Sequence, residues 1–173
     1  ISHVLGWVGQ IPAESADSYL RQGYRNDAIV GVSGLESRYE PYLRGTDGER
    51  KIEVDAMGEP TRRGVISERP AKAGSILVTS IDYDVQKELA EALREKVMTS
   101  SIEGGAGVVM KIDTGEIVAL ASFPQIPIAD LSSGRQTPEV KAMNADDNPR
   151  PPGRNRALWA YPPASPFKSV TAI

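Results

Sequence analysis

Near its C-terminal end the chain reads Tyr161-Pro162-Pro163-Ala164-Ser165-Pro166-Phe167-Lys168. On a helical turn, Ser165 and Lys168 would lie on one side with their Cβ atoms roughly 5–6 Å apart. A lysine that is desolvated or set beside another positive charge loses its proton more easily, and it can then act as general base for a serine nucleophile. Pro166 suits the first helical position, which predicts that Ser165 is the N-cap and that its N–H is available to an oxyanion.

Upstream of this segment the sequence predicts a β-hairpin. Two apolar runs, residues 108–112 and 116–122, flank the short loop Asp113-Thr114-Gly115, which is the pattern of two strands joined by a turn. Both runs are apolar at nearly every residue except Lys111, so we expect the strands to be covered on both faces.

A helix is predicted directly before the hairpin, from Tyr83 to about Met98, with Asp82 as its N-cap. Its apolar side chains fall on one face and its charged side chains on the rest. The residues expected on the apolar face are Val85, Leu89, Ala92, Leu93 and Val97.

The first part of the chain is rich in glycine and charged residues, and it predicts short elements. We expect helices over residues 15–22 and 34–43, a turn at 45–48, a strand over 50–55, a break at 60–64 and a β-rich run at 75–81. Residues 124–156 are rich in Pro, Asn, Asp and Arg and predict a long irregular stretch.

Other patterns that could carry chemistry have weaker support. The glycines of residues 104–107 suggest a phosphate-binding loop, but a strand rather than a helix is predicted to follow them. Asp113-Thr114-Gly115 matches the core of aspartic proteases and is also ordinary turn chemistry. Asp146-Asp147-Asn148 offers oxygen ligands without the spacing of a calcium loop. His3, the single histidine, would have to reach a serine from the N-terminus to form a triad.

Composition narrows the classes of function. The formal net charge is −3, and the basic residues are dispersed, so no surface for nucleic acid is predicted. The chain has no cysteine, which excludes disulfides and thiolate metal sites. No apolar run approaches the roughly 20 residues that span a bilayer. The chain begins at Ile1 rather than Met, so we expect that an upstream segment has been removed and that the missing span says nothing about the parent protein.

The segment around Ser165 resembles the active-site serine region of class B penicillin-binding proteins, whose usual form is Tyr-x-Pro-Gly-Ser-Thr-Phe-Lys followed by Thr-Ala. Here Ala164 replaces the glycine and Pro166 the threonine. Further segments resemble the family in the family's own order. They are His3 to Gly6, Gly34-Leu35-Glu36, Tyr39-Glu40, Leu43-Arg44-Gly45, Thr79 to Asp82 with Gln86, Gly107 to Pro124 and Asn155-Arg156-Ala157.

The resemblance implies an α+β fold of two parts. Residues 1–72 would form an elongated, non-catalytic pedestal or dimerisation-type subdomain. Residues 73–173 would form the N-terminal part of a penicillin-recognising serine transpeptidase domain, consisting of a helix, a β-hairpin and the nucleophile helix. The family's later motifs Ser-x-Asn and Lys-Thr-Gly do not occur in the sequence, so we expect the 173-residue chain to be inactive by itself.

The implied activity is that of a D,D-transpeptidase of peptidoglycan cross-linking, with Ser165 as nucleophile, Lys168 as general base and no metal or organic cofactor. Its expected partners are the D-Ala-D-Ala stem peptide, β-lactam antibiotics and, through the pedestal, membrane-bound proteins of cell-wall synthesis. The resemblance also implies a location at the outer face of the bacterial cell membrane, with an anchor in an N-terminal segment that is not present in this chain. Two alternatives stay open: a non-catalytic scaffold of a cell-wall synthesis complex, and a β-lactam receptor or β-lactamase relative.

Overall fold

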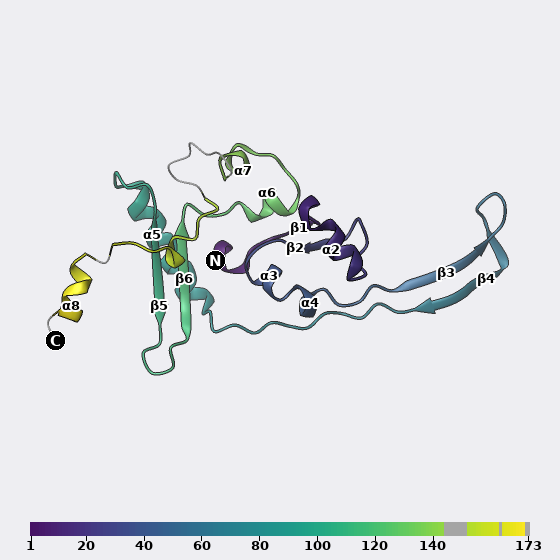
Figure 1. Ribbon diagram of the computed structural model, residues 1–173, viewed down its shortest axis with the longest axis horizontal. Coiled ribbons are helices and arrows are strands. Elements are labelled where there is room, and N and C mark those ends of the chain that lie inside the picture. Colours follow the sequence, from purple (N-terminus) through teal and green to yellow (C-terminus); the bar gives the residue numbers. More distant parts are fainter. Residues whose placement is uncertain (144–151, 163, 172–173) are drawn as a thin grey trace. The chain divides into compact units, whose positions relative to one another are not determined.

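The computed structural model describes residues 1–143, 152–162 and 164–171. It is a mixed α+β structure in which the described strands form small two-stranded antiparallel sheets (Figure 1). The chain divides into two compact units. The N-terminal unit contains residues 5–79 and 131–135, and the C-terminal unit contains residues 1–4, 80–130 and 136–173.

The N-terminal unit contains a small sheet of β1 (Val8–Gln10) and β2 (Ile29–Gly31). The side chain of Glu40, which is 6% exposed, accepts a hydrogen bond from the backbone N–H of Gly31 at 2.8 Å. A Cβ atom on Gly31 would lie 2.2 Å from the backbone of Glu36. Glycine is therefore required where this strand passes the following helix.

Short helices surround this sheet, as the sequence predicts. They are η1 (Ala13–Ser15), α2 (Ala16–Arg21), α3 (Gly34–Arg38) and α4 (Glu40–Leu43). The first helix, α1 (Ser2–Leu5), belongs mostly to the C-terminal unit. The helix predicted over residues 15–22 is confirmed as α2, although the Ser15 side chain makes no capping hydrogen bond. The helix predicted over residues 34–43 is present as two helices that meet at Tyr39.

A long β-hairpin follows, formed by β3 (Glu49–Val54) and β4 (Pro60–Arg69). The break predicted at residues 60–64 is wrong, because these residues belong to β4. Pro60 lies at the first position of the strand, where proline is tolerated. Gly64 takes a φ of +61° near an irregularity in the register, so this glycine accommodates a distortion without ending the strand.

The β-rich run at residues 75–81 does not form a strand. Its first residue donates a backbone hydrogen bond to the carbonyl of Tyr42 at 2.8 Å, and Ser80 Oγ donates to the carbonyl of Ile117 at the same distance. High β-propensity therefore produces an unpaired connecting segment here, because no described strand lies beside it to form a ladder.

The C-terminal unit is built on α5 (Tyr83–Met98) and the hairpin of β5 (Gly105–Met110) and β6 (Ile117–Phe123) (Figure 1). The predicted helix and hairpin are both confirmed. Asp82 is the N-cap, because its carboxylate accepts hydrogen bonds from the backbone N–H groups of Asp84 and Val85 at 3.0 and 3.1 Å.

The apolar face of α5 differs in part from the prediction. Val97 is 1% exposed, and the side chains of Leu89 and Leu93 approach Gly107 and Gly105 of β5. Val85 and Ala92 are exposed, and Gln86 is buried instead. The buried face thus follows residues 86, 89, 93 and 97, a regular three- to four-residue spacing that includes one polar residue.

The two strands of the C-terminal hairpin are unequally covered. Ala119 and Ala121 of β6 are buried, whereas Val108, Val109 and Met110 of β5 are exposed. The prediction that both strands are covered on both faces is therefore wrong for β5. The physical reason is that α5 covers one face only, and among the described residues β5 pairs with β6 alone.

The remaining elements are short. They are α6 (Ile128–Ser132), α7 (Pro138–Met143), η2 (Arg156–Leu158), η3 (Ser165–Phe167) and α8 (Lys168–Thr171). The stretch over residues 124–156, predicted to be irregular, thus contains two short α-helices. Asp146-Asp147-Asn148 lies outside the described residues.

Candidate functional site

The Ser165 segment forms a short helical turn followed directly by α8. The backbone N–H of Phe167 donates to the carbonyl of Ala164 at 3.1 Å, so the turn begins with Ser165 at its first helical position. The helical turn therefore starts one residue earlier than predicted, because Ser165 takes the first helical position that was expected for Pro166. A residue at the first helical position has its N–H outside the helix's own hydrogen bonds, and a backbone N–H of this kind can donate to an oxyanion.

Ala164, immediately before the serine, has a φ of +49°. This left-handed conformation disfavours residues that carry a Cβ atom, at a cost of about 1–2 kcal/mol. The class of active-site segments that this sequence resembles has glycine at this position, which suits such a backbone without strain. The chain therefore makes a sharp turn into the helix that begins at Ser165.

Ser165 and Lys168 lie on one helical segment, as their spacing predicts, and both side chains are exposed. Among the described residues, no hydrogen bond joins the serine hydroxyl to the lysine amine. The serine hydroxyl and the lysine amine therefore both lie near the start of one helical segment, where a reactant can reach them.

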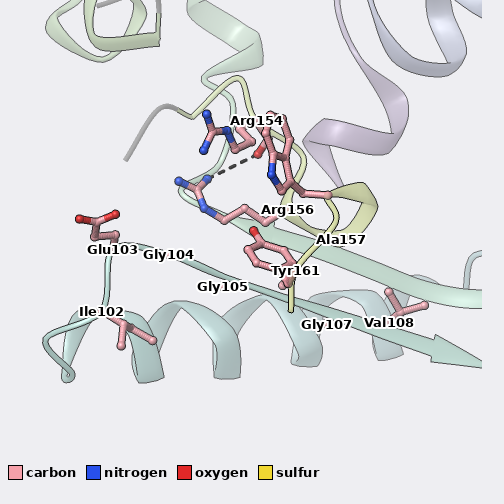
Figure 2. A pocket seen from close by; sticks show the side chains of 12 residues that line it. Ile102, Glu103, Gly104, Gly105, Gly107, Val108, Arg154, Arg156, Ala157 and Tyr161 are labelled. Carbon is pink, nitrogen blue, oxygen red and sulfur yellow. Dashed lines mark hydrogen bonds between the residues drawn. The ribbon is translucent and has the colours of Figure 1, made fainter. Parts of the chain in front are cut away.

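An open cavity of about 670 Å³ lies along the outer edge of β5, where the glycines of residues 104–107 form one wall. The opposite wall comes from the segment that leads towards Ser165. It consists of Arg154, Arg156, Ala157, Trp159 and Tyr161. Figure 2 shows the Arg156 side chain reaching towards Gly104, with Tyr161 beside it.

The glycines of this wall serve close packing. A Cβ atom on Gly105 would lie 2.9 Å from Leu93, and one on Gly107 would lie 2.8 Å from Leu89. Both glycines belong to a strand, so no helix N-terminus follows them to present N–H groups to a phosphate. Their sequence pattern is explained by the approach of α5 to β5.

The segment at residues 154–157 is held against β6 by Ser122, which is 4% exposed. The hydroxyl of Ser122 accepts a hydrogen bond from the backbone N–H of Arg156 at 3.0 Å and donates one to the carbonyl of Arg154 at 3.3 Å. Sequence reasoning did not identify Ser122, because a serine in an apolar strand has no local pattern that reveals its partner.

Asn155 and Arg156 complete this attachment. The Asn155 side chain accepts from the backbone N–H of Ala157 at 3.1 Å and caps η2. Arg156 is 8% exposed, and one guanidinium nitrogen lies 3.5 Å from the carbonyl of Arg154. Burial lowers the pKa of the Arg156 guanidinium, while the nearby Tyr161 acts in the opposite direction. Arginine stays charged in proteins.

His3 packs against the same region. Its Nε2 atom lies 2.6 Å from the carbonyl of Pro152, a contact that the Nε2–H tautomer makes as a donor. Burial lowers the pKa of His3, the hydrogen bond to the carbonyl of Pro152 acts in the opposite direction, and the charges of the N-terminus and Arg156 add smaller lowering effects. The stability of the unit should therefore decrease as the pH falls below the ordinary value of 6.5. This contact supports a partly packed histidine rather than a catalytic base.

Asp113-Thr114-Gly115 forms the turn between β5 and β6. Gly115 takes a φ of +74° and donates a backbone hydrogen bond to the carbonyl of Lys111 at 2.9 Å. Lys111 Nζ lies 2.8 Å from a carboxylate oxygen of Glu116. The tripeptide therefore has the geometry of a turn, with an ion pair beside it.

Within the described ranges, no group of three or more His, Cys, Asp or Glu side chains could hold a metal ion. In the same part of the chain, no helix has the length and apolar character needed to cross a membrane.

Comparison with known proteins relates the chain to one family. Residues 1–79 match the family model of the penicillin-binding protein dimerisation domain. The chain is 34% identical over 171 residues to penicillin-binding protein 3 of Bacillus subtilis, covering 99% of this chain and 23% of that protein. It is 30% identical over 175 residues to the peptidoglycan D,D-transpeptidase MrdA of Acinetobacter baumannii, covering 99% and 24% respectively. The chain thus spans about a quarter of the length of these relatives.

Solved structures give the same result. One solved structure matches with a TM-score of 0.71 at 33% identity, over 99% of this chain and 30% of that chain. Its description is "Structural coordination of polymerization and crosslinking by a peptidoglycan synthase complex". Penicillin-binding protein 2B of Streptococcus pneumoniae strain 5204 matches with a TM-score of 0.55 at 25% identity, over 71% and 22%. The similarity therefore extends far beyond the Ser165 segment.

Proposed function

Because the chain belongs to the class B penicillin-binding proteins, we propose that it carries the nucleophile of a peptidoglycan D,D-transpeptidase. Ser165 is the nucleophile and Lys168 is the general base. The observation that carries this proposal is the helical turn that begins at Ser165 after the left-handed Ala164, with Lys168 three residues further on. A serine nucleophile with a lysine three residues further on at a helix start is compatible with this chemistry.

In the proposed reaction, Ser165 Oγ attacks the carbonyl carbon of the penultimate D-Ala of a stem peptide while Lys168 accepts the hydroxyl proton. The bond to the terminal D-Ala breaks, and the proton passes to the leaving amine. The resulting acyl-enzyme transfers its acyl group to an amine on a neighbouring strand. A β-lactam, which resembles the D-Ala-D-Ala end, acylates the same serine. None of these steps requires a metal or an organic cofactor.

The N-terminal unit is proposed to be the pedestal of this enzyme. Its support is the match of residues 1–79 to the dimerisation-domain family, together with the likeness to a chain of a peptidoglycan synthase complex. We propose that this unit contacts membrane-bound proteins of cell-wall synthesis at the outer face of the bacterial cell membrane. The anchor would lie upstream of Ile1.

A non-catalytic scaffold is the second candidate function. It is favoured by the extent of the family model, which ends at residue 79 and therefore does not include Ser165. The same match disfavours a β-lactamase relative, because it assigns the first part of the chain to a dimerisation domain.

Labelling with a fluorescent penicillin tests the proposal. The protein is prepared as the 173-residue chain and as a longer chain extended to the length of its relatives. We expect the longer chain to be labelled and the shorter one not to be. Ser165→Ala should abolish labelling, and Lys168→Ala should slow it by roughly 10²–10⁴-fold. Ser101→Ala, at an exposed serine after α5, is the matched control and should label normally.

Two results decide between the candidates. If the folded longer chain is not labelled, the transpeptidase assignment is wrong and the scaffold is favoured. If the longer chain is labelled and Ser165→Ala is labelled equally well, another residue is the nucleophile.

A further inference from the structure

Ser122 joins two parts of the C-terminal unit that are far apart in the sequence. It lies in β6, and its hydroxyl both accepts from the N–H of Arg156 and donates to the carbonyl of Arg154. Because the residue is 4% exposed, water cannot easily replace either hydrogen bond. Loss of the hydroxyl would remove the acceptor of the buried Arg156 N–H, which is costly in a protein interior. The carbonyl of Arg154 is part-buried and keeps the contact with the Arg156 guanidinium at 3.5 Å.

The arginine side chain fixes the same segment from the other side. Figure 2 shows the Arg156 side chain extending towards Gly104. A Cβ atom on this glycine would be 2.5 Å from Arg156 Nε and 2.6 Å from the carbonyl of Phe123. Asn155, between the two arginines, caps η2. We call these contacts of Ser122, Gly104 and residues 154–156 the Ser122 clamp.

The path from the clamp to Ser165 is short, and residues 158–162 along it are exposed. Ser165 follows Arg156 by nine residues in the sequence. Along this path the guanidinium of Arg154 stacks on the Trp159 ring with 4.1 Å from Cζ to the ring centroid, and Tyr161 lines the cavity along β5. The clamp is therefore the point at which the segment leading to Ser165 is attached to the hairpin.

We propose that Ser122 is a positioning residue for the nucleophile, acting through the backbone of residues 154–156 to set where the Ser165 turn begins relative to β5 and β6. This inference rests on the proposed transpeptidase function. Reaction rates are sensitive to displacement of a reacting group, and an error of about 1 Å can lower a rate by about 10²-fold. Loosening the clamp displaces the start of the turn while Ser165 and Lys168 themselves remain intact.

The test is the second-order rate of acylation by fluorescent penicillin, measured on the full-length protein that contains this chain, together with the melting temperature. Ser122→Ala removes both hydrogen bonds and should lower the acylation rate by at least about tenfold. Ser122→Thr keeps the hydroxyl on a side chain that favours strands and should restore most of the rate. Val140→Ala, at a buried residue of α7 outside the clamp, is the control for loss of stability and should lower the melting temperature without slowing acylation of the folded protein.

Folded Ser122→Ala protein that is acylated at the wild-type rate would overturn the proposal. The proposal would also be overturned if Ser122→Ala and Val140→Ala lowered the melting temperature equally and slowed acylation equally. The slower acylation would then result from lost stability. If Ser122→Ala does not fold, the pair Asn155→Ala and Asn155→Asp takes its place. The aspartate retains an acceptor for the N–H of Ala157, so only the alanine variant should be slow, and equal rates would contradict the clamp.

Failure of the underlying function gives a different result. In that case the wild-type protein is not labelled, or Ser165→Ala is labelled as well as the wild type. If labelling of the wild-type protein requires Ser165 and the Ser122→Ala variant is acylated at the normal rate, only the positioning role of Ser122 is rejected.

Discussion

The chain contains two β-hairpins of similar kind that are stabilised in different ways. The β5–β6 hairpin is apolar and packs against α5, with Ala119 and Ala121 fully or nearly fully buried. The β3–β4 hairpin carries exposed side chains along most of its length, and each of its strands packs chiefly against the other. A two-stranded hairpin is marginal in water by itself. The β5–β6 hairpin therefore depends on packing against α5, and the β3–β4 hairpin depends on cross-strand pairing.

The largest expected difference between the hairpins is in the cost of removing a valine side chain. Val97 of α5 is 1% exposed beneath the β5–β6 hairpin, whereas Val54 of β3 is 52% exposed. Val97→Ala should lower the free energy of unfolding by about 2–3 kcal/mol through lost burial and a residual cavity. Val54→Ala should change it by less than about 0.5 kcal/mol.

Urea unfolding of the two variants, followed by circular dichroism, measures both values. Equal costs would show that the β3–β4 hairpin is also part of a packed core, and the contrast between the hairpins would be lost.

A smaller difference is expected from hydrogen bonds to side chains. Gln86 Oε1 accepts from the backbone N–H of Leu120 in β6 at 2.8 Å, and Gln86 is 3% exposed. Gln86→Ala leaves this N–H without its acceptor and should cost about 1–3 kcal/mol.

The matched change in the other hairpin is Thr61→Ala. Thr61 Oγ1 donates to Glu53 at 2.7 Å in a part-buried position, and Glu53 has a further interaction of its own. We expect a cost below about 1 kcal/mol. Amide hydrogen exchange provides a second measurement, since Gln86→Ala should speed exchange at Leu120 and leave β3 and β4 unchanged. A faster exchange in β3 after Gln86→Ala would contradict the separation.

The same contrast explains what the sequence could predict. The helix at residues 83–98 and the β5–β6 hairpin were predictable because their apolar spacing and the Asp82 cap are local signals. The extent of β4 was not, because Pro60 and Gly64 are local signals for a break that the strand tolerates at its first residue and near an irregular register. The exposure of β5 was not predicted, because apolar side chains indicate that a strand tends to be buried. They do not indicate whether another helix or strand packs on it.

Some features of the candidate site were likewise predictable from the sequence and others were not. The helical start at Ser165 was predictable from Pro166 and the serine–lysine spacing, and the roles of Ser165 and Lys168 remain predictions. The contacts of Ser122 were not predictable, since they join residues 32 and 34 positions apart in the sequence. Hydrogen bonds of this kind depend on tertiary packing, which no periodic pattern encodes.

The smallest expected effect concerns an exposed ion pair at the turn of the β5–β6 hairpin. The hydrogen bond and charge of Lys111 lower the pKa of Glu116 below its ordinary value of 4.5, with a smaller contribution from Thr114. Because the folded-state pKa is lowered, the pair stabilises the protein above pH 4.5, and this contribution is lost as the pH falls through the lowered pKa. Lys111→Met should raise the pKa of Glu116 towards 4.5, as measured by NMR titration of its carboxyl group.

Lys51→Met in β3 is the matched control. Lys51 pairs with Glu49 at 3.4 Å in the other hairpin, so its loss should leave the titration of Glu116 unchanged. In 1 M salt the wild-type pKa should also move towards its ordinary value, because screening acts over about 3 Å at that ionic strength and the pair is exposed. A Glu116 titration that neither Lys111→Met nor salt alters would show that the hydrogen bond of Thr114, rather than the ion pair, sets this pKa. The polar end of the β5–β6 hairpin would then be fixed, like its apolar strands, by packing and hydrogen bonds rather than by charge.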